Sequence, residues 1–200
     1  IDGGYAIFPD AGTYTLTAEV GGITSNEMTV TVLGEEESAL DWGYDNDITD
    51  SETLAGFDGN SSCTRAQAVT FLWRMAGSPV VTNTVSAFDD VPADSYYWNA
   101  VQWATANGIT AGIGSGLFGS NSTCTRGQMA ALLYRYADSP AIDGELPFAD
   151  VSADSYYAKA VIWAVENGIT NGVSETTFAP DNICTRAQIV AFLYRAFANR

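Results

Sequence analysis

The chain contains no histidine. Histidine is the commonest general base and the commonest transition-metal ligand, so its absence removes the usual centre of acid–base catalysis and of metal binding. The 24 acidic residues offer many carboxylate pairs of the kind used in glycoside hydrolysis, but none lies in a recognisable catalytic motif. We therefore expect no enzyme activity, no catalytic residue, no cofactor and no metal site.

Basic residues are also scarce. The eight lysines and arginines leave a formal net charge of -16. Nucleic-acid binding needs clustered basic side chains, so we expect no nucleic-acid partner. No apolar run approaches the length that a bilayer requires, so we expect no membrane insertion. An acidic, lysine-poor chain suits a secreted, extracellular module. Because the chain starts at Ile1 without a signal peptide, we expect it to be part of a longer protein, and its oligomeric state is left open.

Cysteine occurs only three times, at Cys63, Cys124 and Cys184. This even spacing excludes a zinc site, which needs close cysteine pairs. Each cysteine immediately precedes a predicted helix start, where a small apolar side chain can pack on the first turn. We expect three free thiols that lie too far apart for a disulfide. The alternative is one disulfide, with the odd cysteine free for an intermolecular link.

The cysteines belong to a repeated motif, Cys-Thr-Arg-x-Gln, that begins at positions 63, 124 and 184. A threonine followed three residues later by glutamine, before an apolar run, is a capping box. The motif therefore predicts three helices that begin at Arg65, Arg126 and Arg186. Shifting residues 88–135 by 60 positions gives identity at 26 of 48 residues, so the chain carries an internal repeat.

Each unit is predicted to contain two helices joined by a glycine-rich loop. In the second unit, Tyr97, Ala100, Val101 and Ala104 follow helical spacing, and Gly108 ends that helix. The first unit is shortened, with its first helix at about residues 36–46 and Ser51 at the position of Gly112. The expected ranges are 34–80 for the partial first unit, 86–140 for the second and 146–200 for the third.

Residues 1–33 have a different pattern. Two runs alternate between apolar and polar residues, 13–20 and 27–32, with Gly21 and Gly22 between them. This pattern predicts two paired strands. The segment resembles the closing strands of bacterial immunoglobulin-like domains, although it is too short for a complete sandwich.

The order of motifs in residues 37–200 resembles the S-layer homology (SLH) repeat. It runs Phe-x-Asp-Val, an aromatic helix, Gly-Ile-x-x-Gly, Phe and Thr-Arg-x-Gln. The resemblance implies a mainly α fold in which three helix–loop–helix units form a three-lobed, pseudo-threefold body. It also implies non-covalent anchoring to the cell wall, through binding of an acidic secondary cell-wall polysaccharide in grooves between the lobes.

The resemblance implies which residues line those grooves. The expected ligand-binding residues are the motif arginines, the loop glycines and two aspartates as hydroxyl acceptors: Arg65, Arg126, Arg186, Gly112, Gly172, Asp90 and Asp150. An arginine beside free amides at a helix N-terminus can hold a carboxylate, and a salt bridge is the competing interpretation. Because Ser51 replaces a glycine, we expect Arg65 to contribute less than Arg126 or Arg186.

Three other recurring residue types admit two interpretations. The late-helix arginines Arg74, Arg135 and Arg195 suit the negative C-terminal end of a helix, so we interpret them as structural. Trp42, Trp103 and Trp163 are expected in the core, with a sugar platform as the alternative. One tyrosine of each pair, 96–97 and 156–157, is expected to be exposed. Two competing functions are a protein–protein assembly module of a secreted surface protein and an enzyme acting on wall glycan.

Overall fold

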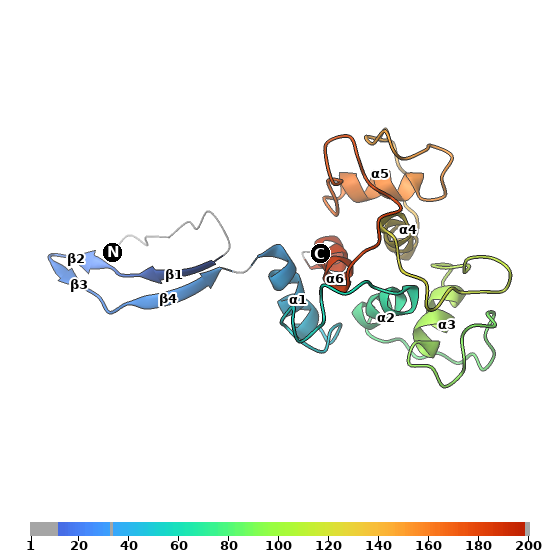
Figure 1. The fold of residues 1–200 in the computed structure, drawn as a ribbon, viewed down its shortest axis with the longest axis horizontal. Coiled ribbons are helices and arrows are strands. Elements are labelled where there is room, and N and C mark those ends of the chain that lie inside the picture. The colour runs from blue at the N-terminus through green and yellow to red at the C-terminus, as the bar shows by residue number, and fades with distance from the viewer. Residues whose placement is uncertain (1–11, 33, 199–200) are drawn as a thin grey trace.

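The computed structural model describes residues 12–32 and 34–198. The part of the expected β segment at residues 1–11 and 33 lies outside the described residues. Over the described ranges the chain forms an antiparallel hairpin followed by a six-helix body, and the hairpin extends away from that body (Figure 1).

The hairpin has two short ladders. Strand β1 (Gly12–Leu16) pairs with β4 (Met28–Val32), from Gly12 opposite Val32 to Leu16 opposite Met28. Strand β2 (Glu19–Val20) pairs with β3 (Ile23–Thr24) around a turn at Gly21 and Gly22, which adopt φ values of +61° and +78°. The predicted strand pairing is therefore confirmed. A two-stranded hairpin buries little surface, and this one leaves Val20 and Ile23 exposed at its tip.

Six helices make up the rest, and their positions agree with the predicted ones to within about two residues. Their bounds are α1 (Glu35–Asp45), α2 (Arg65–Met75), α3 (Trp98–Ala106), α4 (Arg126–Tyr136), α5 (Ala158–Glu166) and α6 (Arg186–Phe197). The second helix of each unit begins with the predicted capping box. In α2, for example, Thr64 Oγ1 accepts from the Gln67 amide at 3.2 Å and Gln67 Oε1 accepts from the Thr64 amide at 2.9 Å.

The helices pair between units rather than within them. Helix α3 packs on α2, α5 packs on α4, and α1 packs on α6 (Figure 1). The first helix of each unit therefore covers the second helix of the preceding unit, and α1 completes the circle by covering the last helix. The expectation that the two helices of one unit form one lobe is therefore wrong. A lone helix–loop–helix unit leaves its apolar faces uncovered, whereas the closed ring covers all three.

The three motif cysteines meet at the centre of this ring. The Cys63 amide donates to the Cys184 carbonyl at 2.9 Å, the Cys124 amide to the Cys63 carbonyl at 2.8 Å, and the Cys184 amide to the Cys124 carbonyl at 2.9 Å. This cyclic set of hydrogen bonds confirms the pseudo-threefold arrangement and excludes a linear stack of units. It also shows that the expected large separation of the cysteines is wrong, because equivalent residues on a threefold axis lie together.

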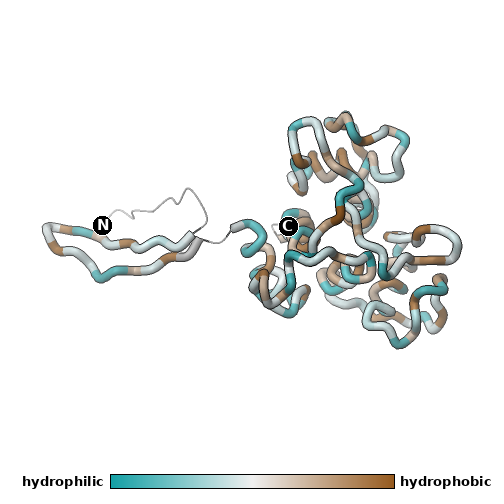
Figure 2. Tube along the Cα trace, viewed as in Figure 1, coloured by the Kyte–Doolittle hydropathy of each residue, from teal (hydrophilic) through white to brown (hydrophobic). Residues whose placement is uncertain are grey.

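All three thiols are free and buried. Burial raises the pKa of Cys63 to about 12 and that of Cys184 to about 11. The core continues outward into the lobes, with Phe57, Phe118 and Phe178 fully buried, and hydrophobic segments recur throughout the helical body (Figure 2). Trp103 and Trp163 lie in this core, as expected, and Trp42 is partly buried against it.

Candidate functional site

The motif arginines are fixed on the loop of the next unit. The Arg65 Nε atom donates to the Phe118 carbonyl at 3.0 Å, and the guanidinium lies 4.9 Å from the centre of the Phe118 ring. Arg126 makes the same two contacts with Phe178, at 2.9 Å and 4.8 Å. Arg186 makes them with Phe57 of the first unit, at 3.0 Å and 4.3 Å. Stacking and a charge-assisted hydrogen bond together hold the plane of each guanidinium in place.

The backbone amides beside these arginines are not free, contrary to expectation. The Arg65 amide donates to the Ser122 carbonyl at 2.8 Å, and the next amide, of Ala66, donates to the Ser120 carbonyl at 3.2 Å. The amides that begin α4 and α6 are paired in the same way. The helix N-termini are therefore used to join neighbouring units.

The late-helix arginines line the same cavities as the motif arginines. Each donates one Nη1 hydrogen bond to a carbonyl that follows the first helix of its own unit: Arg74 to Ile48 at 3.0 Å, Arg135 to Ile109 at 3.3 Å and Arg195 to Ile169 at 3.2 Å. Their predicted structural role is thus present. The same side chains also line cavities, which the sequence-based interpretation did not include. Their constant spacing of nine residues from the motif arginine was a usable signal.

Three equivalent grooves lie between the units, and each combines one motif arginine with one late-helix arginine. The Arg65 groove is lined by Arg65, Gly112, Gln128, Arg135 and Tyr156 and has a volume of about 380 Å³. The Arg126 groove is lined by Glu35, Glu36, Arg126, Gly172, Gln188 and Arg195 and has a volume of about 390 Å³. The Arg186 groove is lined by Asp50, Gln67, Arg74, Tyr96 and Arg186 and has a volume of about 220 Å³.

This arrangement corrects the expected pairing of arginines with loops. Arg65 shares its groove with Gly112, and the first-unit loop faces Arg186 through Phe57. The argument that Ser51 weakens the Arg65 site therefore does not hold. The shift by one unit follows from ring closure, because every motif arginine reaches the loop of the following unit.

Gly112 and Gly172 line grooves, but packing also requires glycine at these positions. Gly112 has a φ of +77°, and a Cβ atom there would lie 2.6 Å from Cε1 of Phe88. At Gly172, with a φ of +80°, a Cβ atom would lie 2.7 Å from the Thr177 carbonyl oxygen. Both the left-handed backbone and the close neighbours exclude a side chain.

Asp90 and Asp150 are occupied within the protein. The Asp90 carboxylate accepts hydrogen bonds from the amides of Phe118, Gly119 and Ser120 at 2.7, 2.8 and 2.8 Å. Asp150 accepts from Phe178 and Ala179 at 2.8 and 2.7 Å. Burial alone would raise the pKa of each carboxyl, but the backbone amides outweigh it and lower the pKa. We therefore assign both aspartates to holding the loops that position Arg65 and Arg126, rather than to accepting hydroxyls of a ligand.

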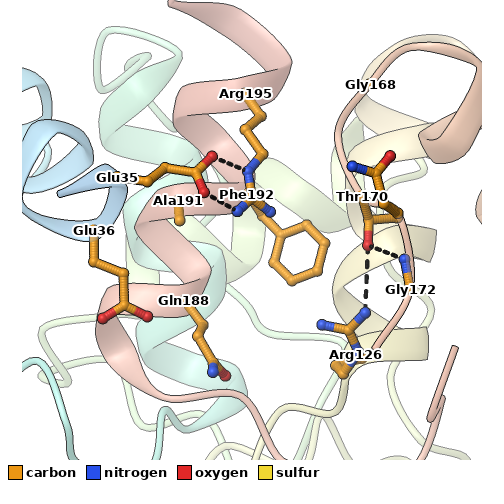
Figure 3. A pocket seen from close by; sticks show the side chains of 11 residues that line it. Glu35, Glu36, Arg126, Gly168, Thr170, Gly172, Gln188, Ala191, Phe192 and Arg195 are labelled. Atoms are coloured by element: carbon orange, nitrogen blue, oxygen red, sulfur yellow. Dashed lines mark hydrogen bonds and ion pairs between the residues drawn. The ribbon is translucent and has the colours of Figure 1, made fainter. Parts of the chain in front are cut away.

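One tyrosine of each pair is exposed, as expected. Tyr96 is 64% exposed and Tyr156 is 61% exposed, and both line grooves. In the Arg126 groove the lining side chains at the α1 end are instead Glu35 and Glu36 (Figure 3).

The polar contacts of the Arg126 groove are internal to the protein. Glu35 forms a two-point ion pair with Arg195, with Oε1 2.5 Å from Nε and Oε2 2.6 Å from Nη2 (Figure 3). On the opposite wall, Arg126 Nη2 donates to Thr170 Oγ1 at 3.3 Å, and the Gly172 amide donates to the same oxygen at 3.3 Å. Both cations of this groove thus have partners in the chain.

Metal binding and membrane insertion are two further possibilities for residues 12–32 and 34–198. These residues bring together no group of three or more acidic or cysteine side chains suited to holding a metal ion. None of the helices described is long and apolar enough to span a bilayer.

Three curated relatives share part of the sequence. A surface-layer 125 kDa protein of Lysinibacillus sphaericus is 37% identical over 51% of this chain. An exoglucanase XynX of Acetivibrio thermocellus is 25% identical over 92% of it, and a cell surface protein of Thermoanaerobacter kivui is 32% identical over 54%. The matches span only 9%, 17% and 15% of the lengths of these relatives.

A family model gives the more specific result. The model of the S-layer homology domain matches residues 87–130 and 147–190. These segments contain the Phe-x-Asp-Val opening, the loop and the capped helix start of the second and third units. Over residues 87–130 and 147–190 the chain therefore belongs to the S-layer homology domain family.

Proposed function

We propose that this chain is a non-catalytic anchoring module that binds an acidic secondary cell-wall polysaccharide at the bacterial cell surface. The observation that carries the proposal is the recurrence of one groove geometry three times, each time with two arginines. A buried arginine fixed on an aromatic ring needs no such repetition for stability, whereas a repeated cationic groove suits a polymer with repeated acidic groups.

The proposal extends to the organisation of the chain. We propose residues 34–80, 86–140 and 146–200 as three repeat units, with 34–80 as a degenerate copy, and residues 1–33 as the end of an immunoglobulin-like domain. Support for the first unit is structural, because α1 completes the ring on α6 and Phe57 takes the place of Phe118 and Phe178.

The names of the relatives support a surface location. Two are a surface-layer protein and a cell surface protein, and the chain spans a small part of each, as an anchor would. The exoglucanase is long enough to carry its catalysis in another domain, since the match spans 17% of it. That enzyme therefore gives no reason to place hydrolysis in this chain.

Co-sedimentation tests the proposal. The protein is mixed with wall sacculi that carry their polysaccharide and with the same sacculi stripped of it. We expect the protein to sediment only with the first. Equal sedimentation with both would contradict polysaccharide binding, and self-association in the absence of sacculi would favour the assembly-module alternative. Release of reducing sugar from the sacculi would instead indicate an enzyme.

A further inference from the structure

The three grooves carry different side chains at the repeat position of Glu35. Glu35 of the first unit corresponds to Tyr96 of the second, 61 residues later, and to Tyr156 of the third, a further 60 residues later. Among the described residues, neither Tyr96 nor Tyr156 forms a hydrogen bond with an arginine, while Glu35 places a carboxylate on Arg195 (Figure 3). In the Arg126 groove, Arg195 is thus occupied by a carboxylate of the protein itself.

The Glu35 ion pair shows which atoms of a late-helix arginine can take a carboxylate. Arg195 uses Nη1 for the Ile169 carbonyl and offers Nε and Nη2, side by side, to the two oxygens of Glu35. Arg135 uses Nη1 in the same way, for the Ile109 carbonyl. In the described part of the chain no hydrogen bond engages Nε or Nη2 of Arg135, so the same two-point edge is free there.

The surroundings of Arg135 are the most favourable for an acidic ligand. No carboxylate lines the Arg65 groove, whereas Asp50 lines the Arg186 groove and two glutamates line the Arg126 groove. A second cavity of about 290 Å³ adjoins the Arg65 groove. Arg135 and Tyr156 line both, and Lys159 lines the second cavity. Lys159 corresponds to Asn99 in the second unit and Ser38 in the first, so this extra cation is specific to one groove.

We propose that the Arg65 groove and the adjoining Lys159 cavity form the principal site for an acidic saccharide. Arg135 binds its carboxylate through Nε and Nη2, and the exposed Tyr156 ring supports a sugar between the two cavities. Glu35 excludes the same ligand from the Arg126 groove by occupying Arg195. This inference rests on the proposed function and names the groove that performs it.

Charge explains why the absence of acids in one groove matters. With a net charge of -16, the protein repels an acidic polymer at long range. Salt screens that repulsion beyond about 8–10 Å, so binding depends on the cations within a few ångströms of the ligand. Arg135 and Lys159 are two such cations in cavities that no carboxylate lines, and Arg65, which is 5% exposed, adds a buried third charge.

Titration calorimetry with oligosaccharide fragments of wall polysaccharide tests the inference. Fragments are used intact and after their carboxyl groups have been reduced to alcohols. We expect one site per chain for intact fragments and at least tenfold weaker binding of reduced ones. Arg135→Gln is expected to weaken binding about tenfold or more, and Arg195→Gln less than twofold. Each variant must melt cooperatively near the parent temperature.

A gain of binding is the more discriminating test. Glu35→Gln frees Arg195 and is expected to raise the number of sites from one to two, and Glu35→Tyr to do the same. Glu27→Gln, which makes the same change of net charge in the hairpin, is the matched control and leaves one site. Should Arg135→Gln fail to fold, the Nε–H NMR signal of Arg135 in the parent protein must shift on addition of fragments.

The outcomes separate the two proposals. If no variant binds intact fragments, the proposed function fails and this inference fails with it. Only the groove assignment is wrong if the parent binds and Arg135→Gln binds equally well. The same holds if the parent binds and its Arg135 Nε–H signal does not shift. Glu35 variants that keep one site overturn the role of Glu35.

Discussion

The aspartate that opens each full repeat unit offers a quantitative test of how the grooves are built. In the second unit the Asp90 carboxylate holds three consecutive amides, residues 118–120, and the carbonyl of Phe118 in turn accepts from Arg65. Asp150 holds only two amides, because the residue corresponding to Ser120 is Pro180, which has no amide hydrogen. The two aspartates therefore form a natural comparison that differs by one hydrogen bond.

The expected magnitude follows from that difference. A hydrogen bond to a charged acceptor contributes about 1.5–3 kcal/mol net. Both carboxylates are accessible to water, which can hydrate the amides after truncation, so the low end of this range applies. We expect Asp90→Ala to lower the free energy of unfolding by about 4–5 kcal/mol and Asp150→Ala by about 3 kcal/mol. Asp94→Ala, at an exposed turn, is the control and is expected to change it by less than about 0.5 kcal/mol.

Urea denaturation followed by circular dichroism measures these differences. The order Asp90, Asp150, Asp94 is the essential result. Equal losses for Asp90→Ala and Asp150→Ala would refute the one-bond argument. A loss no greater than that of Asp94→Ala would refute the view that the carboxylates hold the loops. Asp90→Ala should also weaken polysaccharide binding, because the loop that fixes Arg65 is released.

Three further predictions concern pH, the glycine loop and the thiols. Because the pKa of Asp90 is lowered in the folded state, its contribution to stability is present above the ordinary value of 3.8 and is lost as pH falls through the folded-state value. The free energies of unfolding of the parent and of Asp90→Asn, measured in urea at decreasing pH, should therefore converge. Gly112→Ala should lower the free energy of unfolding by about 1–3 kcal/mol more than Gly114→Ala in the same assay. Both residues have a positive φ, but only at Gly112 would the added Cβ atom meet a neighbour, Phe88. Equal losses would contradict the packing argument. The three motif cysteines should all titrate in the unfolded, unreduced protein. Diamide in mild denaturant should leave one thiol and one disulfide within the chain, since a backbone hydrogen bond of 2.8–2.9 Å joins each two of them. Three surviving thiols would refute the proximity.

The sequence by itself determined the local structure. Each Thr-x-x-Gln capping box fixes a helix start through hydrogen bonds within four residues, so Arg65, Arg126 and Arg186 could be placed at the first helical position without tertiary information. The repeat and its family resemblance also gave the pseudo-threefold body and the motif arginines as candidates. Alternation and the paired glycines gave the hairpin for the same reason, that the relevant interactions are local.

The tertiary structure decided which residues meet across units. Ring closure places each motif arginine on the loop of the following unit and brings three cysteines, about 60 residues apart in sequence, into one cyclic set of hydrogen bonds. It also directs the carboxylates of Asp90 and Asp150, which recur in the two full units, onto backbone amides. Glu35 reaches Arg195 across 160 residues, a pairing that no local pattern carries, because it depends on α1 packing against the last helix. Contacts of this kind depend on closing the chain upon itself, and only the closed fold specifies them.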